Sequence, residues 1–148
     1  LCQDEYDSQY ENVYACSSRQ VADFISWIQE QDFYENTTIV IVGDHKTMDN
    51  EYIEETLTDP DYTRRIYNCI INSRTESDYE KNREFTTLDM FPTTLAALGC
   101  TIEGDKLGFG VNLFSGEETL IERYDIDYID SQLSLYSSYF SEEFVLGH

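Results

Sequence analysis

The feature that most constrains the fold is an uninterrupted apolar run that ends in a glycine and two polar side chains. Residues 37–42 read TTIVIV, and Gly43, Asp44 and His45 follow directly. All six residues of the run are β-branched, which favours a strand over a helix. A run without polar alternation is typical of a strand covered on both faces, as in a parallel sheet between helices. The sequence therefore predicts a buried strand whose carboxyl end presents an aspartate and a histidine.

Helical and strand patterns alternate along the rest of the chain. Between residues 8 and 31, apolar side chains recur every three, four or seven positions, which predicts a long amphipathic helix. Residues 64–73 predict a second buried strand. Residues 85–99 predict an extended entry and then a helix, with Pro92 in its first turn and Gly99 at its C-terminal cap. The alternation predicts an α/β fold with a largely parallel central sheet flanked by helices.

The remaining segments are polar or rich in glycine. Residues 46–65 predict a loop with one short helix, and residues 75–84 predict a solvated loop. Glycines punctuate a looped stretch over 104–116. The acidic, tyrosine-rich tail, residues 121–148, predicts a terminal surface helix over 129–144. We therefore expect two parts, a folded domain over residues 1–120 and this tail.

The net charge of −21 restricts the partners of the chain. It argues against nucleic acid and against anionic membrane surfaces, and it suits a metal ion, a cationic ligand or high solubility. No stretch approaches the roughly 18 apolar residues of a membrane span, and no signal peptide is visible. The sequence begins with Leu1 instead of methionine, and two strands are few for 148 residues. We therefore expect this chain to be part of a longer protein with a larger sheet.

The four cysteines form no CxxC pair, which argues against a zinc ribbon or a thioredoxin-type motif. Cys69 and Cys100 lie in apolar surroundings and are expected to be small buried side chains. Cys2 and Cys16 lie in polar surroundings, where an exported protein could oxidise them. Their connectivity stays open.

Asp44 and His45 are the candidate metal ligands. Open α/β sheets bind ligands at the carboxyl ends of their strands, and a carboxylate oxygen beside an imidazole nitrogen suits Zn²⁺ or Mn²⁺, with Mg²⁺ also compatible. The ordinary alternative is that the aspartate caps the next helix and the histidine is a loop residue. Lys46 could offer its ammonium to a substrate phosphate, and the alternative is a solvated loop lysine.

Three motifs, in order, resemble the C-terminal half of the alkaline phosphatase and sulfatase superfamily. They are WIQEQDFYENTTIVIVGDHKTMD, FTTLDMFPTTLAALG and EGDKLGFGVNLFSG. The chain is most similar to the phosphoglycerol and phosphoethanolamine transferases related to lipoteichoic acid synthase, and the resemblance covers about residues 10–120. It implies that Asp44 and His45 bind the catalytic metal. It also suggests a structural role for Asp89, which suits the N-terminus of the helix that contains Pro92.

The resemblance also implies what lies outside these residues. A nucleophilic threonine, a further acidic metal ligand and a substrate-binding histidine are expected upstream, in the N-terminal half of the same domain, so no catalytic nucleophile is expected in this chain. The resembling enzymes are bacterial, act on lipid- or glycan-linked phosphodiesters, and face outward from the cell membrane through an upstream anchor. Two alternatives stay open: a sulfatase or phosphodiesterase of the same superfamily, and a non-catalytic binding or assembly module.

Overall fold

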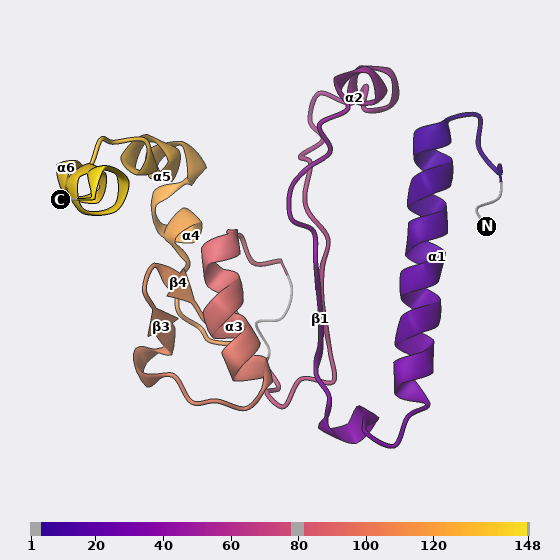
Figure 1. Ribbon diagram of the computed structural model, residues 1–148, viewed down its shortest axis with the longest axis horizontal. Helices are drawn as coiled ribbons and strands as arrows, with labels where there is room; N and C mark the ends of the chain where they lie inside the picture. The colour runs from indigo at the N-terminus through magenta and orange to yellow at the C-terminus, as the bar shows by residue number, and fades with distance from the viewer. Residues whose placement is uncertain (1–3, 78–81, 148) are drawn as a thin grey trace. The chain divides into compact units, whose positions relative to one another are not determined.

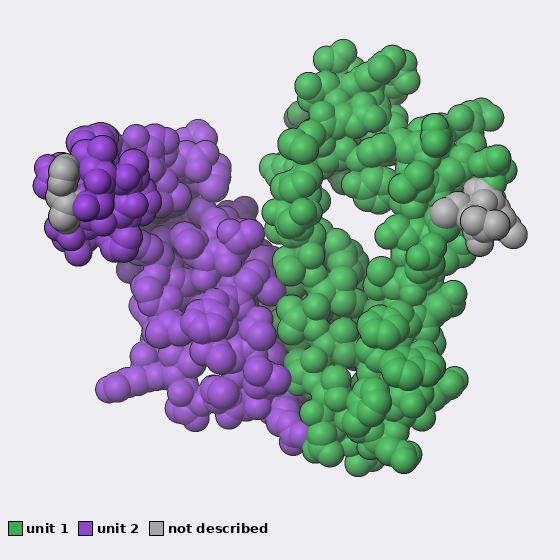
Figure 2. All heavy atoms as spheres, in the orientation of Figure 1, with its two compact units in different colours: residues 1–72 green, residues 73–148 purple. Residues whose placement is uncertain are grey.

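The computed structural model describes residues 4–77 and 82–147, and the chain forms two compact units, Leu1–Asn72 and Ser73–His148 (Figure 2). The first unit combines a long helix with a two-stranded sheet, and the second combines short helices with a small hairpin. Within the described residues, no helix is both long enough and apolar enough to cross a membrane.

The first unit begins with helix α1, Gln9–Gln29 (Figure 1). Ser8 caps its N-terminus by accepting a backbone hydrogen bond at 3.4 Å. The buried Asn12 holds the segment before the helix, because its Oδ1 accepts hydrogen bonds from the backbone of Glu5 at 2.7 Å and of Tyr6 at 2.9 Å. The predicted long helix is confirmed.

Strands β1, Ile39–Val42, and β2, Asn68–Ile71, form a two-stranded sheet alongside α1 (Figure 1). They pair antiparallel, with Ile39 opposite Ile71. The backbone N–H of Gly43 adds one further bond to the ladder, at 2.8 Å. A 3₁₀-helix, η1 (Tyr34–Asn36), turns the chain from α1 into β1.

Both predicted strands exist, but they are not buried on both faces. Their side chains are half-buried, and Val42 is exposed. The antiparallel pairing also differs from the parallel arrangement that an uninterrupted apolar strand favours. One strand pair does not test the larger parallel sheet, which stays a prediction.

The excursion between the two strands carries one short helix, as predicted. This helix is α2, Asn50–Thr56, and Asp49 caps it by accepting a hydrogen bond from the backbone N–H of Tyr52 at 3.1 Å. Asp49, and not Asp44, therefore caps the helix that follows β1.

The second unit is built on helix α3, Met90–Ala97, which follows the 3₁₀-helix η2, Thr87–Asp89. Gly99 ends α3 with a φ of 85°, and its N–H donates to the carbonyl of Ala96 at 2.8 Å. The next N–H, of Cys100, donates to the carbonyl of Leu95 at 3.0 Å. These two hydrogen bonds form a Schellman motif, so the predicted glycine cap is confirmed.

A small hairpin packs against α3. It consists of β3, Lys106–Leu107, and β4, Gly110–Val111, and is preceded by the 3₁₀-helix η3, Glu103–Asp105. Gly108 turns the hairpin with a φ of 62°, which a glycine adopts without steric cost.

Asp89 joins η2 to this hairpin. Its side chain is only 2% exposed, and its carboxylate accepts hydrogen bonds from the backbone of Thr86 at 2.9 Å and of Val111 at 2.8 Å. The buried Thr93 adds a second link, because its hydroxyl donates to the Asp89 carbonyl at 2.6 Å and accepts from the Leu113 backbone at 3.0 Å. Asp89 therefore has the structural role that was predicted for it.

The tail contains several short helices instead of one surface helix over 129–144. The helices are α4 (Leu120–Tyr124), α5 (Ile126–Leu133), α6 (Ser138–Phe140) and the π-helix η4 (Ser141–Leu146). Asp125, with a φ of 68°, separates α4 from α5. Ser137 caps α6 by accepting a hydrogen bond from the backbone N–H of Phe140 at 3.2 Å. The division into units at residue 72 does not test the expected boundary at residue 120.

The cysteines differ from one another in oxidation state and in burial. Cys16 is buried and disulfide-bonded, whereas Cys69 and Cys100 are free thiols. Cys2 lies outside the described residues. Cys69 is half-buried, but Cys100 is exposed, so the prediction that it is buried is wrong. The reason is the Gly99 turn, which directs the chain away from α3 at this residue.

Candidate functional site

Asp44 and His45 lie directly beyond the end of β1, in the first unit. Their side chains are open to solvent, with 87% of Asp44 and 57% of His45 exposed. Lys46 is exposed on the same loop. The three residues that the sequence marked as metal- or substrate-binding candidates are consecutive, and all three are exposed on this loop.

The hydrogen bonds of His45 define which ring nitrogen is available. Nδ1 lies 2.8 Å from the carbonyl oxygen of Lys46. A carbonyl can only accept a hydrogen bond, so Nδ1 donates, and whenever the ring is neutral its lone pair is on Nε2. Nε2 lies 3.5 Å from Oδ2 of Asp44, whose Oδ1 accepts a hydrogen bond from the His45 backbone at 2.9 Å. Nε2 of His45 and Oδ2 of Asp44, two atoms that can bind a metal ion, therefore lie 3.5 Å apart.

A cluster of three tyrosines lies next to this loop. The ring of Tyr10, on α1, lies 4.7 Å from the rings of Tyr14 and Tyr52, measured between centroids. The Tyr10 hydroxyl is hydrogen-bonded to the Tyr14 hydroxyl at 3.1 Å and to Oγ1 of Thr47. The bond to Tyr10 is the main cause that raises the pKa of Tyr14 above 10.0, and the Asp44 carboxylate adds to the effect. Tyr14 is therefore a neutral hydroxyl at physiological pH.

The donor set fits part of a metal site. Two ligands of a tetrahedral ion, each about 2.0–2.1 Å from it, lie about 3.4 Å apart, which is close to the observed separation of Nε2 and Oδ2. A ligating histidine also commonly donates its second ring N–H to a carbonyl, as His45 does. Among residues 4–77 and 82–147, however, no group of three His, Cys, Asp or Glu side chains could hold an ion. Asp44 and His45 alone would give an ion two protein ligands, fewer than the four of a tetrahedral site.

Sequence patterns did not indicate two further residues beside this loop. Tyr10 belongs to the apolar stripe of α1, so its spacing indicated packing and not a polar contact. Arg64 donates from Nη2 to the carbonyl of Thr47 at 3.1 Å, across 17 residues. Nothing in the sequence around Arg64 predicts its hydrogen bond to Thr47.

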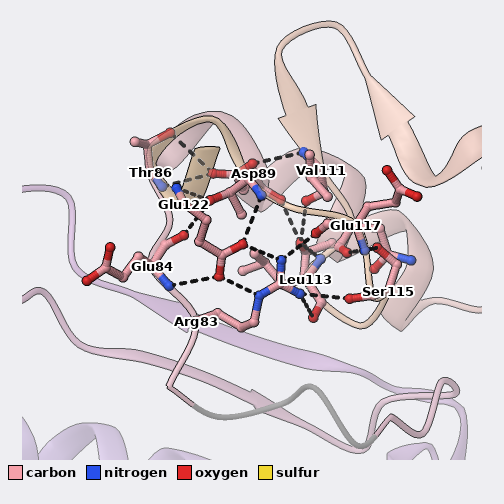
Figure 3. Close-up of polar contacts among 12 residues, drawn as sticks. Arg83, Glu84, Thr86, Asp89, Val111, Leu113, Ser115, Glu117 and Glu122 are labelled. Carbon is pink, nitrogen blue, oxygen red and sulfur yellow. Dashed lines mark hydrogen bonds and ion pairs between the residues drawn. The ribbon is translucent and has the colours of Figure 1, made fainter. Parts of the chain in front are cut away.

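A second polar cluster centres on Arg83 in the other unit (Figure 3). Its guanidinium binds the Glu122 carboxylate through Nε at 2.7 Å and Nη2 at 2.8 Å. It also donates to the carbonyls of Leu113 at 3.2 Å, Ser115 at 2.7 Å and Glu117 at 2.5 Å. Arg83 was predicted to lie in a solvated loop, yet its side chain is only 13% exposed. Residues 78–81 of that predicted loop lie outside the described residues.

This second cluster is structural. The hydrogen bond from Arg83 is the largest cause that lowers the pKa of Glu122 from 4.5 to about 2. Glu122 also accepts from the backbone of Thr119, which completes a capping box at the start of α4. Because the guanidinium is occupied by one carboxylate and three carbonyls, the cluster links the segment at residue 83 to α4 and to the chain after β4.

No family model, no curated protein and no solved structure matches the chain.

Proposed function

We propose that this chain is the C-terminal part of a metal-dependent phosphoglycerol or phosphoethanolamine transferase, and that Asp44 and His45 hold its divalent ion. The observation that carries the proposal is the 3.5 Å distance between Nε2 of His45 and Oδ2 of Asp44, just beyond the carboxyl end of β1. The motifs around residues 27–49, 85–99 and 103–116 support the same class of protein.

Each residue of the loop has a distinct role in this proposal. Asp44 contributes negative charge and an oxygen ligand, and His45 contributes a neutral nitrogen ligand, a combination that suits Mn²⁺ or Zn²⁺, with Mg²⁺ also compatible. The ion, when bound, polarises a phosphoryl oxygen and activates the attacking hydroxyl. Lys46, exposed beside the pair, attracts the phosphodiester by charge.

The remaining parts of the reaction belong to residues outside this chain in the proposal. The resemblance places the nucleophilic threonine and the further ligands in an N-terminal half, and it implies a membrane anchor, an extracytoplasmic location and a lipid- or glycan-linked phosphodiester as substrate. A hydrolase of the same superfamily would use the same Asp44–His45 pair. A non-catalytic module would use the pair for a structural ion or for none.

Metal binding by the 148-residue chain tests the proposal. Titration with Mn²⁺, followed by electron paramagnetic resonance, should show one site of modest affinity, because two protein ligands leave the ion bound mainly to water. Asp44→Asn and His45→Asn should each remove that site. Asp32→Asn is the matched control, since it removes the same charge from another exposed position of the first unit.

Two results would contradict the metal site. One is Mn²⁺ binding in Asp44→Asn that equals the wild type, which would mean that the ion binds elsewhere on this acidic chain. The other is equal weakening by Asp32→Asn, which would reduce the effect to net charge.

An activity assay separately tests the proposal that the nucleophile lies outside this chain. The 148-residue chain alone should not hydrolyse or transfer groups from phosphodiester or sulfate ester substrates, even with added Mn²⁺ or Zn²⁺, because the proposed nucleophile lies upstream. If the purified chain showed metal-dependent turnover, and His45→Asn abolished it, the nucleophile would lie within these 148 residues.

A further inference from the structure

Three hydrogen bonds hold Thr47, in the loop that carries Asp44 and His45. Its Oγ1 is hydrogen-bonded to the Tyr10 hydroxyl on α1 and accepts from the backbone N–H of Asp49 at 3.3 Å. Its carbonyl accepts from Nη2 of Arg64 at 3.1 Å. Contacts from α1, from the start of α2 and from the segment before β2 therefore meet at one residue.

Thr47 is linked to the His45 imidazole through one peptide group. The carbonyl of Lys46, which accepts the hydrogen bond from Nδ1 of His45, belongs to the same planar unit as the backbone N–H of Thr47. This planar unit ends at the Cα of Thr47, so contacts that fix that Cα restrict the positions that the Lys46 carbonyl can take. That carbonyl in turn selects the ring tautomer of His45.

We propose that Tyr10 and Arg64 are positioning residues for the Asp44–His45 pair. By holding Thr47 they hold the Lys46 carbonyl, which keeps the proton on Nδ1 and the lone pair of Nε2 beside Asp44. The proposal rests on the proposed function for the identity of the ligand, but the positioning itself concerns only residues of this chain.

The hydroxyl of Tyr10 can be tested apart from its ring. The ring packs between Tyr14 and Tyr52 at 4.7 Å from each, so Tyr10→Phe keeps this packing and removes only the bond to Thr47 and the bond to Tyr14. Tyr14→Phe is the matched control. It removes a hydroxyl from the same cluster and leaves the Tyr10–Thr47 bond in place.

The first measurement is the tautomer of His45, by nitrogen-15 spectroscopy of its imidazole in the 148-residue chain at about pH 8.5, where an ordinary histidine is neutral. The chain has two histidines, and His45→Asn identifies the signal. The wild type, Tyr14→Phe and Thr47→Ser should show the proton on Nδ1. Tyr10→Phe and Thr47→Val should shift it toward Nε2.

The second measurement is Mn²⁺ affinity in the same variants. Loss of a group that orients a metal ligand costs roughly 10- to 100-fold in affinity, and we expect about tenfold for Tyr10→Phe and Thr47→Val. Thr47→Ser restores the hydroxyl and should bind as the wild type does, which a role in bulk packing would not require. Hydrogen exchange of the β1 and β2 amides confirms that each variant keeps the first unit folded.

The outcomes separate the two proposals. A wild-type tautomer in both Tyr10→Phe and Thr47→Val overturns the positioning role. A shifted tautomer in these variants, with no Mn²⁺ bound by the wild type, would overturn the proposed metal site and leave the positioning role standing. An equal shift in Tyr14→Phe would assign the effect to the tyrosine cluster as a whole and would also overturn the role of Tyr10.

Discussion

At the scale of single residues, the Arg83–Glu122 pair should contribute more to stability than any exposed ion pair of the second unit. Glu122 is 21% exposed, and two short, parallel hydrogen bonds join it to the guanidinium. Glu122→Gln keeps the shape but removes the charge, and it replaces one of the two oxygens that accept from Arg83 with an NH₂ donor. Charged hydrogen bonds contribute roughly 1.5–3 kcal/mol, and partial exposure lowers this, so we expect a loss of about 1–2 kcal/mol.

The Lys106–Glu117 pair provides the control for this prediction. Its Nζ–Oε2 distance is 2.5 Å, but both side chains are more than 40% exposed. Solvent weakens such a pair, so Glu117→Gln should leave the unfolding temperature, followed by circular dichroism, almost unchanged. Equal effects of the two substitutions would show that the Arg83 cluster contributes no more than a surface pair.

The pH dependence of the wild type follows from the same carboxylate. The Arg83 hydrogen bond holds the pKa of Glu122 at about 2 in the folded chain, below the usual 4.5. A lowered pKa adds stability that is fully present above pH 4.5 and is lost as the pH falls toward 2. The stability difference between wild type and Glu122→Gln should therefore shrink across that interval. A difference that is constant from pH 6 to pH 2.5 would contradict this assignment.

At the scale of elements, the contact between η2 and the β3–β4 hairpin requires a glycine. A Cβ on Gly110 would lie 2.0 Å from the carbonyl oxygen of Leu88 and 3.1 Å from Cγ of Pro92. Gly110→Ala must therefore push the hairpin away from η2 and α3, at a cost of about 2–4 kcal/mol. Hydrogen exchange of the Val111 amide, which donates to Asp89, should accelerate accordingly.

Gly108→Ala is the control within the same hairpin. A Cβ at Gly108 meets no atom within 4 Å, so its cost is only that of a positive φ, about 1 kcal/mol. If the two alanine variants lost the same stability, the close approach of Gly110 to the Leu88 carbonyl would not be the cause of the loss.

Local patterns predicted the elements whose determinants lie within a few residues of one another. The apolar stripe of α1, the β-branched run before Gly43, and the Pro92 and Gly99 signals at α3 all act over one or two helical turns. Asp44, His45 and Asp89 could be found in the same way, since each stands at the end of an element. Contacts between residues far apart in the sequence could not be predicted in this way. Arg83 and Glu122 are 39 residues apart, and no local pattern relates them.

The same limit applies to the pairing of the strands and to the breaks in the tail. An apolar strand shows that it will be covered, but not by what, so the antiparallel pairing of β1 and β2 did not follow from their composition. The tail has a weak amphipathic pattern throughout. The breaks near Asp125 and Ser137 depend on backbone angle and capping, which the hydrophobic pattern does not record.

At the scale of the whole molecule, large apolar side chains on α1 remain accessible. Phe24 is 59% exposed and Trp27 is 51% exposed, and their rings stack 5.8 Å apart at an interplanar angle of 11°. The sheet beside this helix has two strands, and a two-stranded sheet with unpartnered edges is marginally stable and open to further pairing. We therefore expect the isolated chain to be stable only when these surfaces are covered, by an N-terminal half or by another copy.

Sedimentation velocity over a range of protein concentrations, combined with hydrogen exchange, tests this expectation. The net charge of −21 opposes association, so added salt should screen the repulsion and shift the isolated chain toward oligomers. Trp27→Lys should weaken that association by placing a charge in the exposed face of α1. Phe109→Lys, the same kind of change at a 71% exposed aromatic of the second unit, should not. A cooperatively folded, protected monomer at every salt concentration would show that the 148 residues are self-sufficient, and it would favour the binding module over the fragment of an enzyme.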